Sequence, residues 1–265
     1  MTERTIHTEG GAYIEQGVHT GGDFVARDQI KYEATVIVTS PEDANRIVAE
    51  QARKAALLAG TFTRLPFEPE CVMISSDFHI GKYPVTNAQY AAFLSENSAQ
   101  PAPRSVGWFL NQPPAHKVDH PVVGVSWHEA VAYCAWLSEA TGRPYRLPSQ
   151  TEWERAARGP EAYRYPWGNE WQENAANVDS QDTTSITAYP DGASPYGCQD
   201  MLGNVQEWTA THRVRDDYIH CGGYYSNTAQ ELHCGLHDTS HADTQVPWRG
   251  FRILLALRLP SGENP

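Results

Sequence analysis

Two pairs of adjacent histidine and cysteine residues carry the side chains best suited to bind a soft metal ion. They are His220-Cys221 and His233-Cys234, and imidazole and thiolate are the ligands that zinc and copper prefer. On a regular strand, however, adjacent side chains point to opposite faces, so one pair cannot easily hold one ion. The five cysteines are also an odd and thinly spread set for a disulfide scaffold. We therefore interpret Cys221 and Cys234 as free thiols or as two thiols that lie close together.

The segment around these pairs has the composition of an adaptable binding surface. Five of the 11 histidines lie between residues 212 and 241, and residues 216–245 include no lysine, methionine or tryptophan. Tyrosine supplies rigid contact area, while serine, asparagine and histidine supply adjustable hydrogen bonds. The alternative interpretation is a polar, solvated loop. The candidate ligand-binding residues are Asp216, Tyr218, His220, Tyr224, Tyr225, Asn227, His233, His237, Asp238, Ser240 and His241.

The composition of the chain excludes several classes of partner. The 32 acidic and 20 basic side chains give a net charge of -12, which repels a phosphate backbone and argues against nucleic acid. No segment approaches the ~20 apolar residues that a membrane helix needs. The first residues also lack the apolar core of a signal peptide. We therefore expect a globular cytoplasmic protein without membrane contact.

Three helix starts indicate how the candidate residues are positioned. Capping boxes pair Thr86 with Gln89, Ser126 with Glu129, and Ser149 with Glu152. The helix after Ser126 should end near Gly142, because glycine commonly closes a helix. Strand-like segments follow at residues 218–225 and 250–259, and loop-forming residues dominate between residue 158 and these strands. The sequence therefore predicts an α+β fold that is rich in irregular loops.

The first 61 residues differ from the rest of the chain. The string GGAYIEQGVHT is followed by the similar string GGDFVARDQIK, which predicts short paired strands after each Gly-Gly turn. These strands form either a hairpin within the chain or an arm that pairs between subunits. A helix is predicted over residues 41–59, with an apolar stripe that must be covered. We expect an N-terminal β and helix appendage over residues 1–61, and we expect residues 1–60 to serve attachment or self-association.

Five motifs in the rest of the chain carry a family resemblance. GKYPVTNAQYAAFL, HPVVGVSWHEAVAYCAWLSEATGRPYRLPSQTEWERAARG, YPWGNEW, SPYGCQDMLGNVQEWTA and GFRI follow one another between residues 81 and 253. Together they resemble the formylglycine-generating-enzyme/sulfatase-modifying family. The resemblance implies a C-type-lectin-like domain over residues 62–265. This family holds oxidases, the sulfoxide synthases of ergothioneine biosynthesis and members without known catalysis, so the fold does not fix the function.

The resemblance implies a test for copper chemistry. Formylglycine-generating oxidases hold Cu(I) between two cysteine thiolates that are spaced five residues apart after a Gly-Gly strand, and soft Cu(I) prefers thiolates. The matching strand here begins at Gly222-Gly223, and the expected positions carry Asn227 and Leu232. Neither residue supplies a thiolate, so we expect no oxidase machinery. The sulfoxide-synthase branch needs a helical iron-binding domain, for which residues 1–60 are too short.

The resemblance also implies a structural calcium site in the segment GNVQEW. Calcium takes six to eight oxygen ligands, and the family's loop supplies backbone carbonyls and one glutamate. The alternative interpretation is that Glu207 and Trp208 only brace the loop. No other cofactor is required. The implied ligands are the carboxylate of Glu207 with the carbonyls of Leu202, Gly203 and Val205, and, at a second site, Asn177 and Val178 joined by Asp182.

The composition of the C-terminal segment resembles that of one group of relatives, the variable proteins of diversity-generating retroelements. Their mutagenesis replaces adenines and yields tyrosine, histidine, aspartate, serine or asparagine, but never lysine, methionine or tryptophan. The mutagenesis does not yield glutamate or glutamine either, so residues 216–245, within a candidate variable region 213–252, fit this pattern with Gln230, Glu231 and Gln245 as fixed scaffold positions. We therefore expect a noncatalytic, receptor-like protein that binds a protein or another macromolecule through its C-terminal surface. The alternatives are an ordinary noncatalytic member and a copper oxidase or other enzyme of the family.

Overall fold

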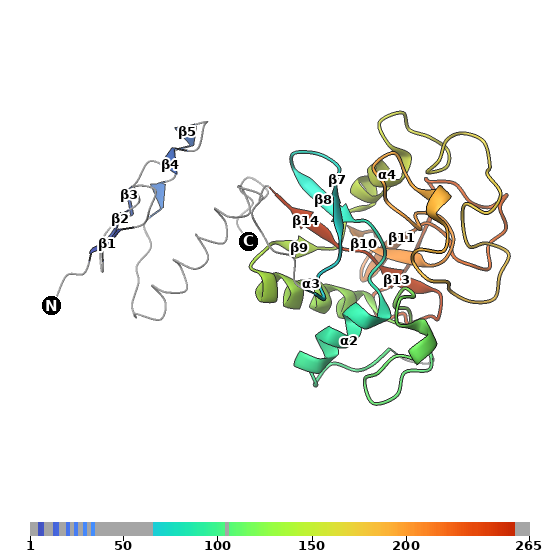
Figure 1. Ribbon diagram of the computed structural model, residues 1–265, viewed down its shortest axis with the longest axis horizontal. Coiled ribbons are helices and arrows are strands. Elements are labelled where there is room, and N and C mark those ends of the chain that lie inside the picture. The colour runs from blue at the N-terminus through green and yellow to red at the C-terminus, as the bar shows by residue number, and fades with distance from the viewer. Residues whose placement is uncertain are drawn as a thin grey trace. The chain divides into compact units, whose positions relative to one another are not determined.

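The chain divides into two units, Met1–Phe62 and Thr63–Pro265. The computed structural model describes residues 66–103 and 106–257, together with the backbone of six short strands nearer the N-terminus (Figure 1). No helix among these described residues is long and apolar enough to cross a bilayer.

The first unit contains paired strands at the predicted Gly-Gly repeats. Strands β1 (Thr5–His7) and β2 (Tyr13–Glu15) pair antiparallel, as do β3 (Thr20–Gly21) with β6 (Glu33–Ala34) and β4 (Phe24–Val25) with β5 (Gln29–Ile30). The apolar positions that follow the two Gly-Gly pairs thus lie in β2 and β4. The helix predicted over residues 41–59 lies outside the described residues.

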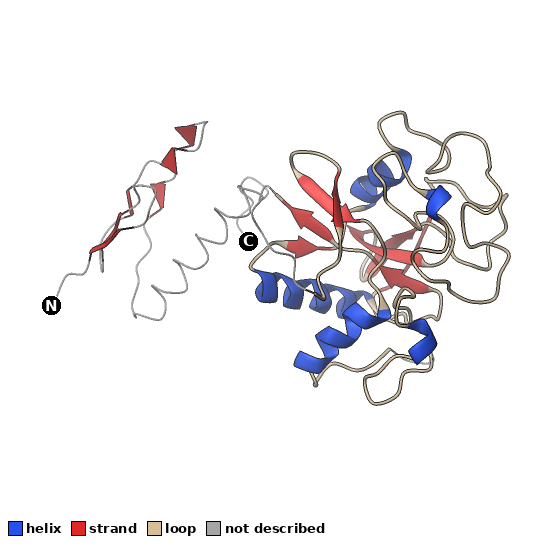
Figure 2. Ribbon diagram, in the orientation of Figure 1, coloured by secondary structure: helices blue, strands red, loops and turns tan. Residues whose placement is uncertain are grey.

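The second unit contains two four-stranded sheets, drawn in red in Figure 2. The first sheet has the order β7-β8-β14-β9 and the second the order β12-β11-β10-β13. The first comprises β7 (Cys71–Met73), β8 (Phe78–Gly81), β9 (Tyr145–Arg146) and β14 (Leu254–Ala256). The second comprises β10 (Gln206–His212), β11 (Asp217–Cys221), β12 (His237–His241) and β13 (Arg249–Phe251). All neighbouring strands run antiparallel except β10 and β13, which are parallel.

All three predicted capping boxes are present. They begin α2 (Asn87–Glu96), α3 (Trp127–Thr141) and α4 (Gln150–Arg158). Helix α3 ends at Gly142, whose φ of 68° is the left-handed conformation that favours glycine. Two short 3-10 helices, Ala115–Lys117 and Pro190–Gly192, interrupt long loops. Figure 2 shows that these loops make up much of the domain, as the sequence predicts.

The strand predictions are correct in place but wrong in extent. The strand predicted over residues 218–225 ends at Cys221, because Gly222 and Gly223 take φ values of 94° and 68° and turn the chain away. The strand predicted over residues 250–259 is split into β13 and β14. Arg252 and Ile253 lie between the two strands, so one predicted strand contributes to both sheets.

Aromatic side chains fill the space between the helices and the second sheet. Tyr90 of α2 stacks on Tyr133 of α3 with ring centroids 5.9 Å apart, and Phe251 of β13 contacts both rings edge-on. A second cluster gathers around Trp153 of α4 beneath β11. These two clusters hold the sheet that carries the candidate binding residues.

Candidate functional site

Strands β11 and β12 form the exposed end of the second sheet. Tyr218 lies opposite Ser240, and His220 lies opposite Asp238. Strand β12 is at the edge of the sheet, and each of its residues is exposed or half-buried, whereas β13 is buried throughout. The term C-terminal surface is used below for the exposed and half-buried candidates on these strands and just before them: Asp216, Tyr218, His237, Asp238, Ser240 and His241.

The first turn of α3 supports the C-terminal surface. The Trp127 ring stacks on the Tyr218 ring with centroids 3.8 Å apart and planes at 17°. Trp127 also donates from its ring to the carbonyl of Thr209 (2.9 Å) and from its backbone to the carbonyl of Ala242 (2.8 Å). Trp127 is not among the site residues that the sequence predicts. Its position directly after the capping Ser126 was the available signal, since that cap fixes where the helix begins.

The candidates on β11 and β12 occupy both faces of the sheet. Directly opposed residues of an antiparallel pair share a face, and successive residues alternate. Tyr218, Asp238 and Ser240 therefore lie on one face, while His237 and His241 lie on the other. His237 is anchored there by Gln150 of α4, whose Nε2 is 3.2 Å from Nδ1 of the histidine. The C-terminal surface thus wraps around the edge strand.

His220 is inside the domain, which corrects its prediction as a ligand-binding residue. Its side chain is 2% exposed, lies edge-on against Trp208 with ring centroids 5.7 Å apart, and contacts the Ser240 hydroxyl at 3.1 Å. Burial, followed by the charge of Arg249, lowers the pKa of His220 to about 3. The imidazole is therefore neutral at ordinary pH and supports the surface from beneath.

Four further candidates lie in the loop between β11 and β12, namely Tyr224, Tyr225, Asn227 and His233. Oδ1 of Asn227 accepts the backbone N–H of Tyr224 at 2.9 Å, and its Nδ2 donates to Glu231 at 3.2 Å. The Tyr224 ring stacks on Trp248 with centroids 5.3 Å apart. The carbonyl of His233 accepts the backbone N–H of Leu236. The Asn227 and Tyr224 side chains thus hold the loop in shape.

The positions that would supply copper thiolates serve structural roles. Leu232 is fully buried in the hydrophobic cluster that also contains Cys221 and Cys234. Both thiols are free, and burial raises the pKa of Cys221 well above its ordinary value and that of Cys234 to about 12. They are therefore protonated and unreactive at neutral pH. The described residues include no group of three or more histidine, cysteine, aspartate or glutamate side chains that could hold a metal ion.

The implied calcium site does not fit the observed contacts of Glu207. Arg252 donates to both carboxylate oxygens, from Nε to Oε2 at 2.6 Å and from Nη2 to Oε1 at 2.7 Å. Trp153 donates to Oε2 at 2.7 Å, and Arg252 and Glu207 are both fully buried. The guanidinium and the indole N–H together occupy three of the roughly four lone-pair positions of this carboxylate. The contacts fit the bracing interpretation instead.

Protein hydrogen bonds also occupy Asn177, an implied ligand of the second calcium site, whose Nδ2 donates to the Asp182 carbonyl at 2.9 Å. The Asn177 carbonyl accepts the backbone N–H of Asn204 at 2.9 Å, and its Oδ1 accepts the Ser180 hydroxyl at 2.7 Å. Gly203 lies so close that a Cβ there would be 2.3 Å from the Asn177 carbonyl oxygen. Leu202 and Val205 are buried, and Val178 packs partly buried on the hydrophobic cluster. These contacts connect the two loops.

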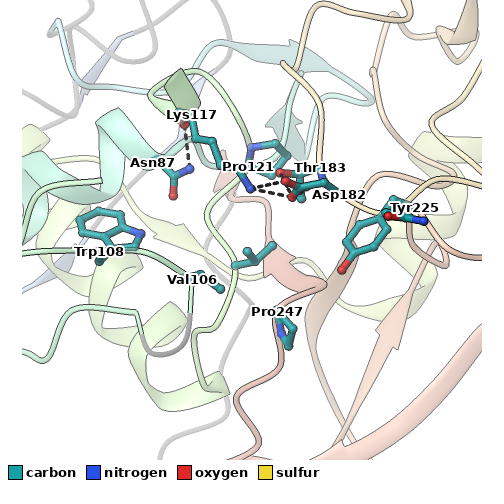
Figure 3. Close-up of a pocket in the computed structure, with 11 residues that line it drawn as sticks. Asn87, Val106, Trp108, Lys117, Pro121, Asp182, Thr183, Tyr225 and Pro247 are labelled. Atoms are coloured by element: carbon teal, nitrogen blue, oxygen red, sulfur yellow. Dashed lines mark hydrogen bonds and ion pairs between the residues drawn. The ribbon is translucent and has the colours of Figure 1, made fainter. Parts of the chain in front are cut away.

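A cavity of about 250 Å³ opens beside the loop that follows β11 (Figure 3). Tyr225, one of the predicted ligand-binding residues, lines it from this loop. Asp182, which the sequence implied only as a calcium ligand, also lines it, and the remaining lining residues were not predicted, because they come from three distant parts of the sequence. They are Asn87, Val106, Trp108, Lys117, Pro121, Val123, Gln181, Thr183 and Pro247.

The helices, the two sheets and the long loops define an α+β domain of the C-type-lectin-like type. The chain belongs to the family of the sulfatase-modifying factor enzyme 1-like domain, whose family model matches residues 24–257. The match begins inside the region that the sequence analysis assigned to the N-terminal appendage. The prediction of this family and fold is confirmed.

Curated relatives include both active and inactive proteins. The chain is 37% identical to the formylglycine-generating enzyme of Mus musculus, over 56% of this chain and 47% of the enzyme. It is 32% identical to the inactive C-alpha-formylglycine-generating enzyme 2 of Mus musculus, over 51% of this chain and 58% of that protein. The chain thus spans less than two thirds of each relative.

Solved structures share the fold. PvdO from Pseudomonas aeruginosa is 25% identical with a TM-score of 0.58, over 68% of this chain and 80% of PvdO. Treponema denticola variable protein 1 is 20% identical with a TM-score of 0.55, over 67% of this chain and 84% of that chain. The second similarity is one of fold alone.

Proposed function

We propose that this protein is a noncatalytic, receptor-like ligand-binding protein that recognises a macromolecular partner through its C-terminal surface. The observation that carries the proposal is the contrast in burial within one sheet. The edge strand β12 presents exposed or half-buried polar side chains, while β13 at the opposite edge is fully buried. Substitutions at the edge therefore change what the surface presents without changing the core.

The chemistry of the loop after β11 supports a noncatalytic role. Asn227 and Leu232 stand where the oxidases carry thiolates, and the first is hydrogen-bonded within its loop while the second lies in the core. The two cysteines nearby are buried thiols with raised pKa values. One relative of this chain carries the name inactive C-alpha-formylglycine-generating enzyme 2.

We also propose that segment 213–252 is diversified by a retroelement. The support is its composition, which combines tyrosine, histidine, aspartate, serine and asparagine on the edge strand β12, at the half-buried start of β11 and in the loop between these strands. A solved protein of the same fold is titled a variable protein. The partner is a protein or another macromolecule, because the surface extends along an edge strand instead of enclosing a small molecule.

A display library tests the binding role. All six residues of the C-terminal surface are randomised, and the library is selected for binding to a soluble test protein such as hen lysozyme. A matched control library randomises five exposed residues on α2 and α3: Ala88, Ser95, Val131, Ala135 and Glu139. We expect folded binders from the first library and far fewer from the second.

Two results of this selection would overturn the proposal. The first is loss of folded protein in the C-terminal library, which would mean that these side chains build the domain. The second is an equal yield of binders from both libraries, which would mean that the C-terminal surface has no special capacity for recognition.

A further inference from the structure

The cavity beside Tyr225 has the size of a single side chain. Its volume of about 250 Å³ is below the ~300–1,000 Å³ of pockets that enclose a whole small-molecule ligand. In Figure 3, aromatic rings flank it on two sides, Trp108 on one and Tyr225 on the other, while Lys117 and Asp182 meet along its upper edge. A group that protrudes from a larger ligand fits this space better than a free cofactor.

The charges at the cavity cancel each other. Nζ of Lys117 is 2.6 Å from both carboxylate oxygens of Asp182, and the backbone N–H of Thr183 donates to Oδ1 of the same carboxylate at 2.8 Å. Burial opposes ionisation of Asp182, but the hydrogen bonds from Lys117 and Thr183 outweigh it and lower the pKa. The Asp182 side chain is 62% exposed, so the pair is screened by water, and it leaves the cavity no net charge to attract a charged guest.

One deeply buried side chain directs an unused acceptor into the cavity. Asn87 is 4% exposed, and its Nδ2 donates to the Lys117 carbonyl at 2.8 Å. Because a carbonyl only accepts hydrogen bonds, this contact fixes which end of the amide is the nitrogen. In the described part of the chain, Oδ1 of Asn87 accepts no hydrogen bond, and Figure 3 shows it pointing away from Lys117 toward the open space. Solvent in the cavity reaches this oxygen, so a donor of a ligand would replace a water molecule there.

Two aromatic side chains supply the complementary donors. Neither Nε1 of Trp108 nor the hydroxyl of Tyr225 makes a hydrogen bond within the described residues. Both are neutral, and both rings offer flat apolar surfaces to a planar group. The cavity thus combines one unused acceptor with two unused donors between aromatic walls.

We propose that this cavity binds the neutral carboxamide of a ligand, such as an asparagine or glutamine side chain of a protein partner. The NH₂ of the carboxamide donates to Asn87, and its carbonyl, which has two lone pairs, accepts from both Trp108 and Tyr225. The inference deepens the proposed function, since the carboxamide would belong to the ligand of the C-terminal surface. Recognition would then combine a variable surface with a pocket built mainly by other segments.

Three small probes of nearly the same shape test the charge requirement. Acetamide is neutral, acetate is an anion and acetamidinium is a cation. Each is titrated into the full-length protein while the indole N–H resonance of Trp108 and the side-chain NH₂ resonance of Asn87 are followed by NMR. The Trp108 resonance is assigned by its loss in Trp108→Phe. We expect acetamide alone to shift both resonances in a saturable way.

Two conservative variants locate the site. Tyr225→Phe removes only the hydroxyl and should weaken acetamide binding about two- to tenfold, the effect of one lost hydrogen bond. Tyr224→Phe is the matched control, because Tyr224 stacks on Trp248 and does not line the cavity, and it should bind acetamide as the parent does.

Three results would each overturn the carboxamide proposal. The first is that acetate or acetamidinium shifts the two resonances as much as acetamide does, and the second is that acetamide causes no saturable shift. The third is that Tyr225→Phe and Tyr224→Phe weaken acetamide binding equally. These outcomes are independent of the library selection, because the probes require no natural ligand. Failure of the probes with a successful library would leave the binding role intact. If the probes bind as expected but the library fails, the carboxamide site in the cavity is supported and the binding role of the C-terminal surface is rejected.

Discussion

Nε of Arg252 lies 2.6 Å from Oε2 of Glu207, and neither side chain is exposed to solvent. Arg252 also donates to the backbone carbonyls of Gly81 (2.9 Å) and Gln199 (2.9 Å). One guanidinium therefore connects β10 with the last residue of β8 and with the loop that precedes β10. Arg252 lies where the chain passes from one sheet to the other. This contact explains why the segment after Phe251 is not one continuous strand.

Removal of either partner should strongly destabilise the domain. Arg252→Met leaves a buried carboxylate, and Glu207→Leu leaves a buried guanidinium. Each should cost about 3–5 kcal/mol in the free energy of unfolding, measured by urea denaturation. The double variant should recover part of this loss, because no buried charge is left unpaired. Single variants whose urea midpoint of unfolding equals that of the parent protein would contradict this role.

Substitutions on the C-terminal surface should be tolerated. The triple variant Asp216→Asn, Asp238→Asn and His241→Gln changes three exposed residues, and each should change stability by no more than ~0.5 kcal/mol. Asn227→Ala is the comparison, because it removes the acceptor for the Tyr224 N–H and the donor to Glu231. Thermal denaturation should show a clearly lower melting temperature for Asn227→Ala than for the triple variant, and the reverse order would contradict the assignment.

His220 should make stability depend on pH. Burial and the charge of Arg249 lower its pKa to about 3 in the folded protein, compared with ~6.5 in an unfolded chain. Protonation therefore favours the unfolded chain. The stabilising effect of the neutral imidazole is complete above about pH 6.5 and is lost as the pH falls from about 6.5 toward 3.

Comparison with His220→Gln isolates this effect from other groups. Asp200 acts in the opposite sense, because burial raises its pKa to about 7, and the comparison cancels it. The stability of the parent relative to the variant should fall by up to ~1.4 kcal/mol per pH unit across the window. Urea denaturation at several pH values measures the difference, and a difference that does not change with pH would contradict the buried neutral state.

The protein should not act as a copper oxidase. Because Asn227 and Leu232 occupy the thiolate positions, protein loaded with Cu(I) should leave a cysteine-containing sulfatase peptide unchanged. Mass spectrometry of the peptide detects conversion of cysteine to formylglycine. Product that forms with the parent and disappears with Cys234→Ser would show a catalytic site built from a different thiol.

Local signals in the sequence predict the regular elements well. The capping boxes at Thr86, Ser126 and Ser149 fix three helix starts, since each depends on residues only three positions apart. The motifs from residue 81 to residue 253 give the family. Strand ends are predicted less well, because the positive φ of Gly222 and the inward turn of Arg252 depend on contacts with distant residues.

Side-chain roles in the site depend still more on tertiary contacts. The composition that marks segment 213–252 does not separate the exposed Asp238 from the buried His220, although the two residues face each other across β11 and β12. The cavity is also invisible in the sequence. Asn87 and Tyr225 come together only when the loops between the helices and the second sheet are in place.

Deep sequencing of this gene in a population of the source organism is the most direct test of a diversified binding surface. We predict that substitutions gather in the codons of exposed residues such as Tyr218, Asp238 and Ser240, replace adenines, and match a second copy of the segment beside a reverse-transcriptase reading frame. The codons of the core residues Ile219 and Leu232 should be invariant. Substitutions spread evenly over exposed and core codons, or a segment that varies no more than the rest of the gene, would contradict the proposed function.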